Sequence, residues 1–444
     1  MRADRSRQSD SVTRFLLKGS IVSIALRIGG VALGYLAHVL LSRLLGLQTY
    51  GEYVVALGWA LVLVLPARVG FDNSALRFST IYLEEGRSGS LRGYVQVAAA
   101  AVGVSSIIGA IVMVLLASRV GKGIPFAALV WGAVTILPLA LLGVGSALLR
   151  TTRRIFAAQF YDQLLRPALL ILLVGGAALA GLALHAATAL MFTAVASALA
   201  LAALLAHLLW VLAPQLRTPA DYSHWREWFS LSIPLLIMGA TQELLNQLEI
   251  ILLGSLAGAR EAGLFSAAWR LASLAPFALV SLSVVSGPLV ASAYHRRDRA
   301  ELHRIASLSA RIGLAFAAVA SVVLLLVGRP LLALFGPEFP EAYPALAILL
   351  AGAMVNAFTG IVGYLLTLTG RQTQALLFFA GGLIVSIVLN LLLIPPFGIV
   401  GAAIASATAL SCWNLAMLFY VRRAIGIDTS AIGLHPVGSN EVEA

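Results

Sequence analysis

Two long uncharged runs constrain the fold of this chain most strongly. Residues 96–116 contain no charged side chain, and neither do residues 123–149. Each run reaches or exceeds the roughly 20 residues that cross a bilayer as a helix. The runs lack alternation of polar and apolar residues and contain scattered glycine and proline, which favours helices over a membrane barrel. The sequence therefore predicts an all-α, polytopic membrane protein.

The composition agrees with this prediction. Of the 444 residues, 60% are hydrophobic and 11% are charged, whereas a soluble chain carries about 25% charged residues. The net charge is +11, but the basic residues lie mostly between the hydrophobic runs. They indicate membrane topology, and we predict no nucleic-acid partner. Cys412 is the single cysteine, so the chain has no internal disulfide and no cysteine-based metal motif.

The hydrophobic runs predict about twelve transmembrane helices, with short connections between them. The first run, near the N-terminus, has no convincing cleavage site and is read as a retained helix. Arginine is concentrated in alternate loops, which by the positive-inside rule places both termini in the cytoplasm and the protein in the cell (inner or plasma) membrane. The predicted helices are at residues 15–40, 50–70, 91–117, 124–149, 160–182, 187–213, 229–257, 263–290, 303–327, 342–369, 373–395 and 399–421.

A weak internal repeat divides the predicted helices into two halves. Gly46 and Gly258 each begin a pattern of glycine, four residues, glycine, one residue and an aromatic, at an offset of 212 residues (258 minus 46). Both patterns join the first two helices of a six-helix half, so the halves are parallel and form two lobes around a central cavity. The predicted parts are an N-terminal tail (1–14), an N-lobe (15–213), a cytoplasmic linker (214–228), a C-lobe (229–421) and a cytoplasmic C-terminal tail (422–444).

The predicted helix at 229–257 carries a polar face. Gln242, Asn246 and Glu249 are spaced i, i+4 and i+7, so they lie on one side of the helix, and Glu243 lies on an adjacent stripe. Such a face should line a water-filled space or pack against polar partners. Because a desolvated carboxyl can bind a proton reversibly, Glu243 and Glu249 are candidates for a coupling-ion role.

Arg27 and Arg270 lie within other predicted helices, where a charged side chain costs about 2.5–3.5 kcal/mol on insertion scales. Arginine binds phosphate oxygens in a bidentate manner. Together with Gln242 and Asn246, the two arginines are therefore candidate ligands of an anionic, phosphate-bearing substrate in the cavity. The alternative is that the intramembrane glutamates pair with these arginines and hold helices together.

The sequence offers no catalytic or metal-binding constellation. It contains no Ser/His/Asp set, no paired loop carboxylates, no P-loop and no histidine at metal-ligand spacing from carboxylates. We therefore predict no enzyme activity, no catalytic residues, no metal and no cofactor.

Several stretches resemble a known family. They are residues 20–51, the AGLFSAAWR sequence at 262–270, the LFGPEF sequence at 334–339, and NLLLIPPFGIVGAAIAS at 390–406. In order and spacing the chain resembles the polysaccharide (O-antigen type) flippases of the multidrug/oligosaccharidyl-lipid/polysaccharide exporter superfamily. The resemblance implies alternating access of two lobes and transport of a polyprenyl-diphosphate-linked oligosaccharide to the outer leaflet, for surface polysaccharide biosynthesis. Arg27 and Arg270 would then meet the diphosphate.

Two other functions stay open. A cation-coupled small-molecule exporter of the same fold would use acidic residues such as Glu243 and Glu249. A membrane polymerase or ligase would need a large outer loop, and the predicted outer loops are short. The expected partners are the lipid-linked oligosaccharide, membrane lipids and polysaccharide polymerase or assembly proteins.

Overall fold

The structure is a computed structural model that describes residues 2–120, 123–152, 154–296 and 298–433. These residues form helices and connecting turns and contain no β-strand. A π-helix, η1 (Phe160–Leu165), precedes α6, and 3-10 helices, η2 (Gln215–Arg217) and η3 (Phe339–Ala342), precede α8 and α12. The α-helices are α1 (Arg2–Arg68), α2 (Phe71–Glu84), α3 (Ser88–Val120), α4 (Phe126–Thr151), α5 (Ile155–Gln159), α6 (Arg166–Leu179), α7 (Ala186–Leu212), α8 (Trp225–Leu256), α9 (Ala259–Ala272), α10 (Phe277–His295), α11 (Arg299–Ala333), α12 (Tyr343–Thr359), α13 (Val362–Leu368) and α14 (Gln372–Ile425).

Nine helical segments of the described chain are long and apolar enough to cross a membrane. Two of the helices, α1 and α14, are longer than one membrane crossing requires. Each contains one residue with non-helical backbone angles, Gly46 in α1 and Gly398 in α14. Each therefore consists of two helical segments that meet at the glycine. The predicted all-α, multi-pass class is confirmed.

The structure interrupts two of the predicted spans. The predicted helix at 263–290 is divided between α9 and α10 by the turn at 273–276, and the one at 342–369 is divided between α12 and α13 at Gly360. Neither break contains a charged residue, which explains why the sequence predicts one helix in each case. The number of twelve crossings therefore stays a prediction.

Packing divides the chain into two units, Met1–Glu243 and Leu244–Ala444. The division falls inside α8, beyond the predicted linker at 214–228. The predicted lobe limits stay a prediction, and each unit is described by itself.

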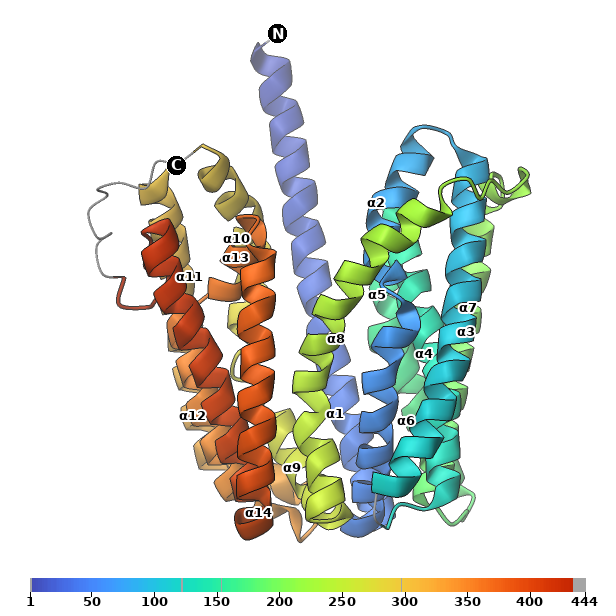
Figure 1. The fold of residues 1–444 in the computed structure, drawn as a ribbon, viewed down its shortest axis with the longest axis vertical. Helices are drawn as coiled ribbons and strands as arrows, with labels where there is room; N and C mark the ends of the chain where they lie inside the picture. The colour runs from blue at the N-terminus through green and yellow to red at the C-terminus, as the bar shows by residue number, and fades with distance from the viewer. Residues whose placement is uncertain (1, 121–122, 153, 297, 434–444) are drawn as a thin grey trace. The chain divides into compact units, whose positions relative to one another are not determined.

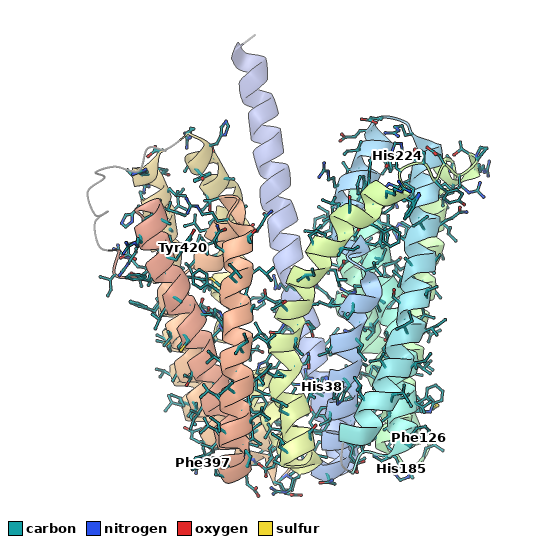
Figure 2. The ribbon with its side chains drawn as sticks, in the orientation of Figure 1. His38, Phe126, His185, His224, Phe397 and Tyr420 are labelled. Carbon is teal, nitrogen blue, oxygen red and sulfur yellow. The ribbon has the colours of Figure 1, made fainter. Side chains whose placement is uncertain are left out.

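In unit 1, α4 contacts α1, α2, α3 and α7 (Figure 1). Its buried side chains include many small residues, among them Ala133, Ala140 and Ala147. Small residues allow membrane helices to approach closely, so their abundance accounts for the central place of α4. His38, labelled in Figure 2, is buried on α1, and its Nδ1 lies 3.1 Å from the Tyr50 hydroxyl on the other side of the Gly46 joint.

The segment between α7 and α8 is fixed to the rest of unit 1. Ser90 Oγ of α3 donates a hydrogen bond to Asp221 Oδ2 at 2.9 Å, and Ser223 N–H donates to Oδ1 at 3.0 Å. Trp228 is fully buried, and its Nε1–H donates to the hydroxyl of Tyr82 at 2.9 Å. The backbone N–H of Ser223, its hydroxyl and that of Ser90 lower the pKa of Asp221 to about 2.

In unit 2, α12 contacts α9, α11 and α14. The turn of α14 at Gly398, which Phe397 marks in Figure 2, is fixed by α9: Ile399 N–H donates to Oε2 of Glu261 at 3.2 Å. Residues 426–433, named here the C-terminal segment, fold back on the unit. Arg422 Nη2 pairs with Asp428 Oδ2 at 2.6 Å, and residues 427–430 are buried. Part of the predicted cytoplasmic tail is thus packed, and its residues 434–444 lie outside the described residues.

Candidate functional site

Glu249, in the last part of α8, is buried within unit 2 and only 4% exposed. Ser386 Oγ of α14 donates a hydrogen bond to its Oε1 at 3.2 Å. Asn390, one turn further along α14, donates from Nδ2 to Ser386 Oγ at 3.1 Å. Since burying a carboxyl group without partners is costly, this chain of hydrogen bonds explains how α8 and α14 accommodate Glu249.

The polar cluster of Glu249, Ser386 and Asn390 has an unused acceptor. Within the described residues Asn390 Oδ1 is buried and has no hydrogen-bond partner. Carboxyl, hydroxyl and amide oxygens are the ligands that hard cations prefer, and a carboxyl group can also carry a proton. The cluster can therefore hold a proton or a small cation. The described residues contain no group of three or more His, Cys, Asp or Glu side chains that could hold a metal ion, so this cluster is not a metal site of that type.

The predicted polar face of α8 is not uniform in burial. Gln242 and Asn246 are exposed, Glu243 is half-buried, and Glu249 is buried. Gln242, Asn246 and Glu249 all lie in α8, as predicted for one helix, but they differ in burial. The amide side chains of Gln242 and Asn246 are therefore exposed, whereas Glu249 of the polar cluster is buried.

Arg270 lies in the last turn of α9 and is half-buried. Its Nε is buried and has no hydrogen-bond partner among the described residues. A buried donor without a partner is unfavourable, typically by about 1–3 kcal/mol, and an anionic ligand would satisfy it.

Arg27 lies in unit 1, on α1, and is exposed. Gly29 and Gly30 follow it, where α1 packs against η1; a Cβ atom at Gly30 would lie 2.9 Å from the carbonyl oxygen of Gln163. The close packing fixes this part of α1 and therefore the backbone from which Arg27 projects. Arg27 and Arg270 belong to different units, and each is described only within its own.

The sequence did not reveal Ser386 as the partner of Glu249. A single serine in a long apolar segment carries no motif. The available signal was its spacing of four residues from Asn390, which places both on one side of α14.

Acidic, basic and amide side chains lie within candidate membrane spans of the described chain, where such residues usually mark a functional site. The profile of the family described as polysaccharide biosynthesis protein matches residues 16–294. The chain belongs to this family, and the predicted resemblance is confirmed. A second profile, MatE, matches residues 234–392.

Two curated relatives match parts of the chain. The probable flippase AglR of Haloferax volcanii is 29% identical over 199 residues, which are 42% of this chain and 40% of the relative. The uncharacterized membrane protein MJ1068 of Methanocaldococcus jannaschii is 40% identical over 73 residues, 16% of this chain and 14% of the relative. The match thus spans less than half the length of either relative.

Solved structures of two kinds share the fold. An inward-facing multidrug resistance MATE family transporter of the MOP superfamily has a TM-score of 0.71 and 15% identity, over 91% of this chain and 98% of that chain. The lipid II flippase MurJ, in an inward closed conformation, has a TM-score of 0.69 and 14% identity, over 91% and 87%. The chain therefore has the fold of MOP-superfamily transporters.

Proposed function

We propose that this protein flips a polyprenyl-diphosphate-linked oligosaccharide from the cytoplasmic to the outer leaflet, by alternating access of two lobes, for surface polysaccharide biosynthesis. The observation that carries the proposal is the match of the polysaccharide biosynthesis family over residues 16–294. The half-buried guanidinium of Arg270, whose Nε has no hydrogen-bond partner in the described chain, supports it. A diphosphate offers the anionic oxygens that this donor lacks.

In this proposal Arg27 and Arg270 bind the diphosphate, and Gln242 and Asn246 bind neighbouring hydroxyl or phosphate oxygens. Arg27→Ala and Arg270→Ala should each abolish surface polysaccharide while the protein still inserts, and lysine at either position should retain part of the activity because the charge is kept. The matched control is Arg329→Ala, which removes an exposed arginine of α11. Normal polysaccharide in both alanine variants would refute the assignment of these residues.

We propose the cluster of Glu249, Ser386 and Asn390 as the coupling-ion site, with Glu243 as a second candidate. The support is the buried carboxyl group, its hydrogen bond from Ser386 and the unused Oδ1 of Asn390. Transport into liposomes should depend on a proton or sodium gradient, and Glu249→Gln should remove that dependence. If the gradient dependence survives in Glu249→Gln and fails in Glu243→Gln, the role belongs to Glu243.

A second candidate function is a cation-coupled small-molecule exporter. The MatE profile match over residues 234–392 and the buried Glu249 favour it, and the fold fits it equally well. Efflux of cationic compounds that depends on Glu249 but not on Arg27 or Arg270 would select this function. Polysaccharide export that depends on the arginines would select the first.

The proposed location is the cell (inner or plasma) membrane, with both termini in the cytoplasm. The support is the distribution of arginine between alternate loops. Labelling of a tag at each terminus in intact and in opened cells tests it: either tag accessible from outside contradicts the topology. Polysaccharide polymerase or assembly proteins are the partners expected in this role.

A further inference from the structure

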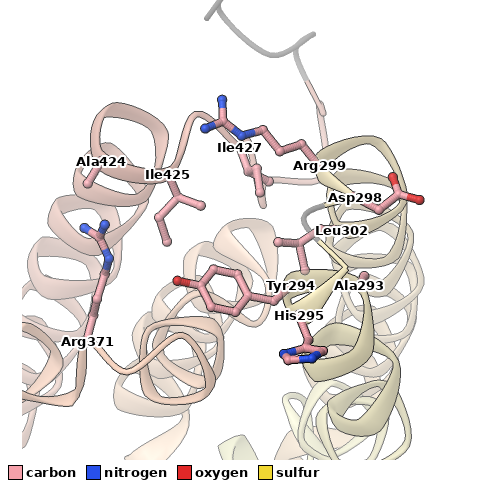
Figure 3. Close-up of a pocket in the computed structure, with 10 residues that line it drawn as sticks. All are labelled: Ala293, Tyr294, His295, Asp298, Arg299, Leu302, Arg371, Ala424, Ile425 and Ile427. Carbon is pink, nitrogen blue, oxygen red and sulfur yellow. The ribbon is translucent and has the colours of Figure 1, made fainter. Parts of the chain in front are cut away.

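A cavity of about 590 Å³ opens at one end of unit 2, where the end of α10, the start of α11 and both ends of α14 meet (Figure 3). The described residues that line it belong to unit 2. By the positive-inside rule this end faces the cytoplasm. The cavity is separate from the cluster around Glu249 and from Arg270, none of which lines it.

Two arginines from separate elements line this cavity. Arg299 is the first residue of α11, and Arg371 immediately precedes α14. Figure 3 shows the two side chains extending from different sides of the opening, with Ile425 between them and the Tyr294 ring lower in the view. His295 lines the same cavity and adds a further nitrogen donor. Four side chains able to donate hydrogen bonds thus surround one space.

The cationic groups of this cavity are not neutralised by acidic neighbours. Within the described chain neither Arg299 nor Arg371 forms an ion pair; Arg371 Nη1 donates instead to the Tyr420 hydroxyl at 3.1 Å. Asp298 is the acidic residue of the described lining, and its Oδ1 accepts the N–H of Glu301 at 3.0 Å, as the cap of α11. The described lining residues therefore carry a net positive charge.

The remaining described lining is apolar. It includes Leu302 and Ile427, which are 2% and 1% exposed, and Ile425. At about 30 Å³ per molecule the cavity would hold roughly 20 waters, far more than a single phosphate group needs. A site that combines two guanidinium groups with buried apolar side chains fits a ligand that is anionic at one end and apolar at the other.

We propose that this cavity binds the phosphate headgroup of an anionic phospholipid from the cytoplasmic leaflet. Arg299 and Arg371 bind the phosphate oxygens from two sides, and the glycerol region lies on Leu302 and Ile427. Basic pockets between membrane helices on the cytoplasmic side are suited to such headgroups. The proposal does not depend on what the protein transports.

The test compares lipid binding by the purified full chain in detergent, titrated with phosphatidylglycerol and with phosphatidylcholine. The wild type should bind phosphatidylglycerol at least about tenfold more tightly, because charge-assisted hydrogen bonds of this kind contribute about tenfold or more. The double variant Arg299→Gln/Arg371→Gln should lose this preference. The matched control is Arg304→Gln, also in α11. The Arg304 side chain is 78% exposed and is not among the lining residues of the cavity. This variant should bind phosphatidylglycerol as the wild type does.

A second variant keeps the test decisive if the double variant does not fold. Ala424→Trp fills the cavity from an exposed lining position and leaves both arginines in place, and it too should lose the preference. An unchanged preference in the folded double variant, or in Ala424→Trp, overturns the proposal. Inorganic phosphate and glycerol 3-phosphate should not compete with the lipid at equal concentration; if they do, the ligand is a soluble phosphate compound and the lipid assignment is wrong.

Discussion

Gly46 and Gly258 share one backbone conformation, although 212 residues (258 minus 46) separate them. Gly46 has φ 74° and ψ 166°, and Gly258 has φ 103° and ψ 168°. Each lies at the joint between two helical segments of its own unit, and the aromatic residues seven positions later, Tyr53 and Phe265, are both buried. The repeat that the sequence suggests thus corresponds to one local structure formed twice.

Alanine at Gly46 or Gly258 should destabilise the protein. An added Cβ atom would meet no neighbour at either position. The free-energy cost therefore comes from the backbone conformation alone, which residues other than glycine rarely adopt. We expect a loss of about 1–3 kcal/mol, measured as a lower unfolding temperature in detergent. Controls are Gly103→Ala and Gly381→Ala, which also have free space but lie in helical backbone; these should be neutral or slightly stabilising. Equal effects at all four positions would contradict the explanation.

Removing the Glu249 carboxyl group should leave the buried hydroxyl of Ser386 without its acceptor. Glu249→Ala is therefore expected to lower stability by about 1–3 kcal/mol, whereas Glu249→Gln keeps an acceptor oxygen and should cost less. The control is Glu338→Ala, an exposed carboxylate whose ion pair with Arg260 should matter little. Thermal unfolding in detergent distinguishes the variants, and a Glu249→Ala variant as stable as the wild type would exclude a structural role for the cluster.

The C-terminal segment should detach when its ion pair is broken. Arg422→Gln removes the 2.6 Å ion pair between Arg422 and the Asp428 carboxylate, whose side chain is 4% exposed. Hydrogen exchange over residues 427–430 should then become faster, together with a stability loss of about 1.5–3 kcal/mol, because a hydrogen bond between two charged groups is lost. Replacement of its exposed neighbour, Arg423→Gln, provides the control. Unchanged protection in Arg422→Gln would show that the backbone contacts alone fix the segment.

The linker before α8 should loosen in acid. Hydrogen bonds from Ser223 and Ser90 lower the pKa of Asp221 to about 2, below the unfolded value of about 3.9. Because the folded state favours the ionised form, its stabilising effect is complete above about pH 4 and is lost as the pH falls through about 2. Hydrogen exchange of residues 221–223 should show this loss in the wild type. The Asp221→Asn variant, which cannot ionise, should show no such transition, and identical pH profiles would contradict the assignment.

The sequence predicts the helical segments because a run of about twenty uncharged apolar residues in a bilayer must satisfy its backbone hydrogen bonds internally, which an α-helix does. It also predicts the joint at Gly46 and its counterpart at Gly258. It does not predict the break in the run 342–369 at Gly360, because the apolar residues continue through the break. Hydropathy reports how apolar a residue is, whereas a helix break depends on backbone conformation and packing.

In the candidate site, too, the position along a helix could be predicted, whereas the packing partners could not. Periodicity predicts one side of a helix for Gln242, Asn246 and Glu249, and all three lie in α8. Periodicity carries no information about what packs there, so the burial of Glu249 against Ser386, 137 residues away, could not be predicted. The packing of the C-terminal segment was missed for a related reason: Thr429 donates to the carbonyl oxygen of Thr359, which is available because α12 ends there.

The hydrogen bond between Glu261 and Ile399 places a constraint on the order of assembly. The two residues are separated by 138 positions, which a ribosome adding 5–20 residues per second covers in roughly 7–28 s. During that interval α9 has been synthesised, but the Ile399 N–H that donates a hydrogen bond to the Glu261 carboxylate in the folded protein has not. The turn of α14 at Gly398 is therefore a late event in biogenesis, and it couples the insertion of the last described helix to one made much earlier.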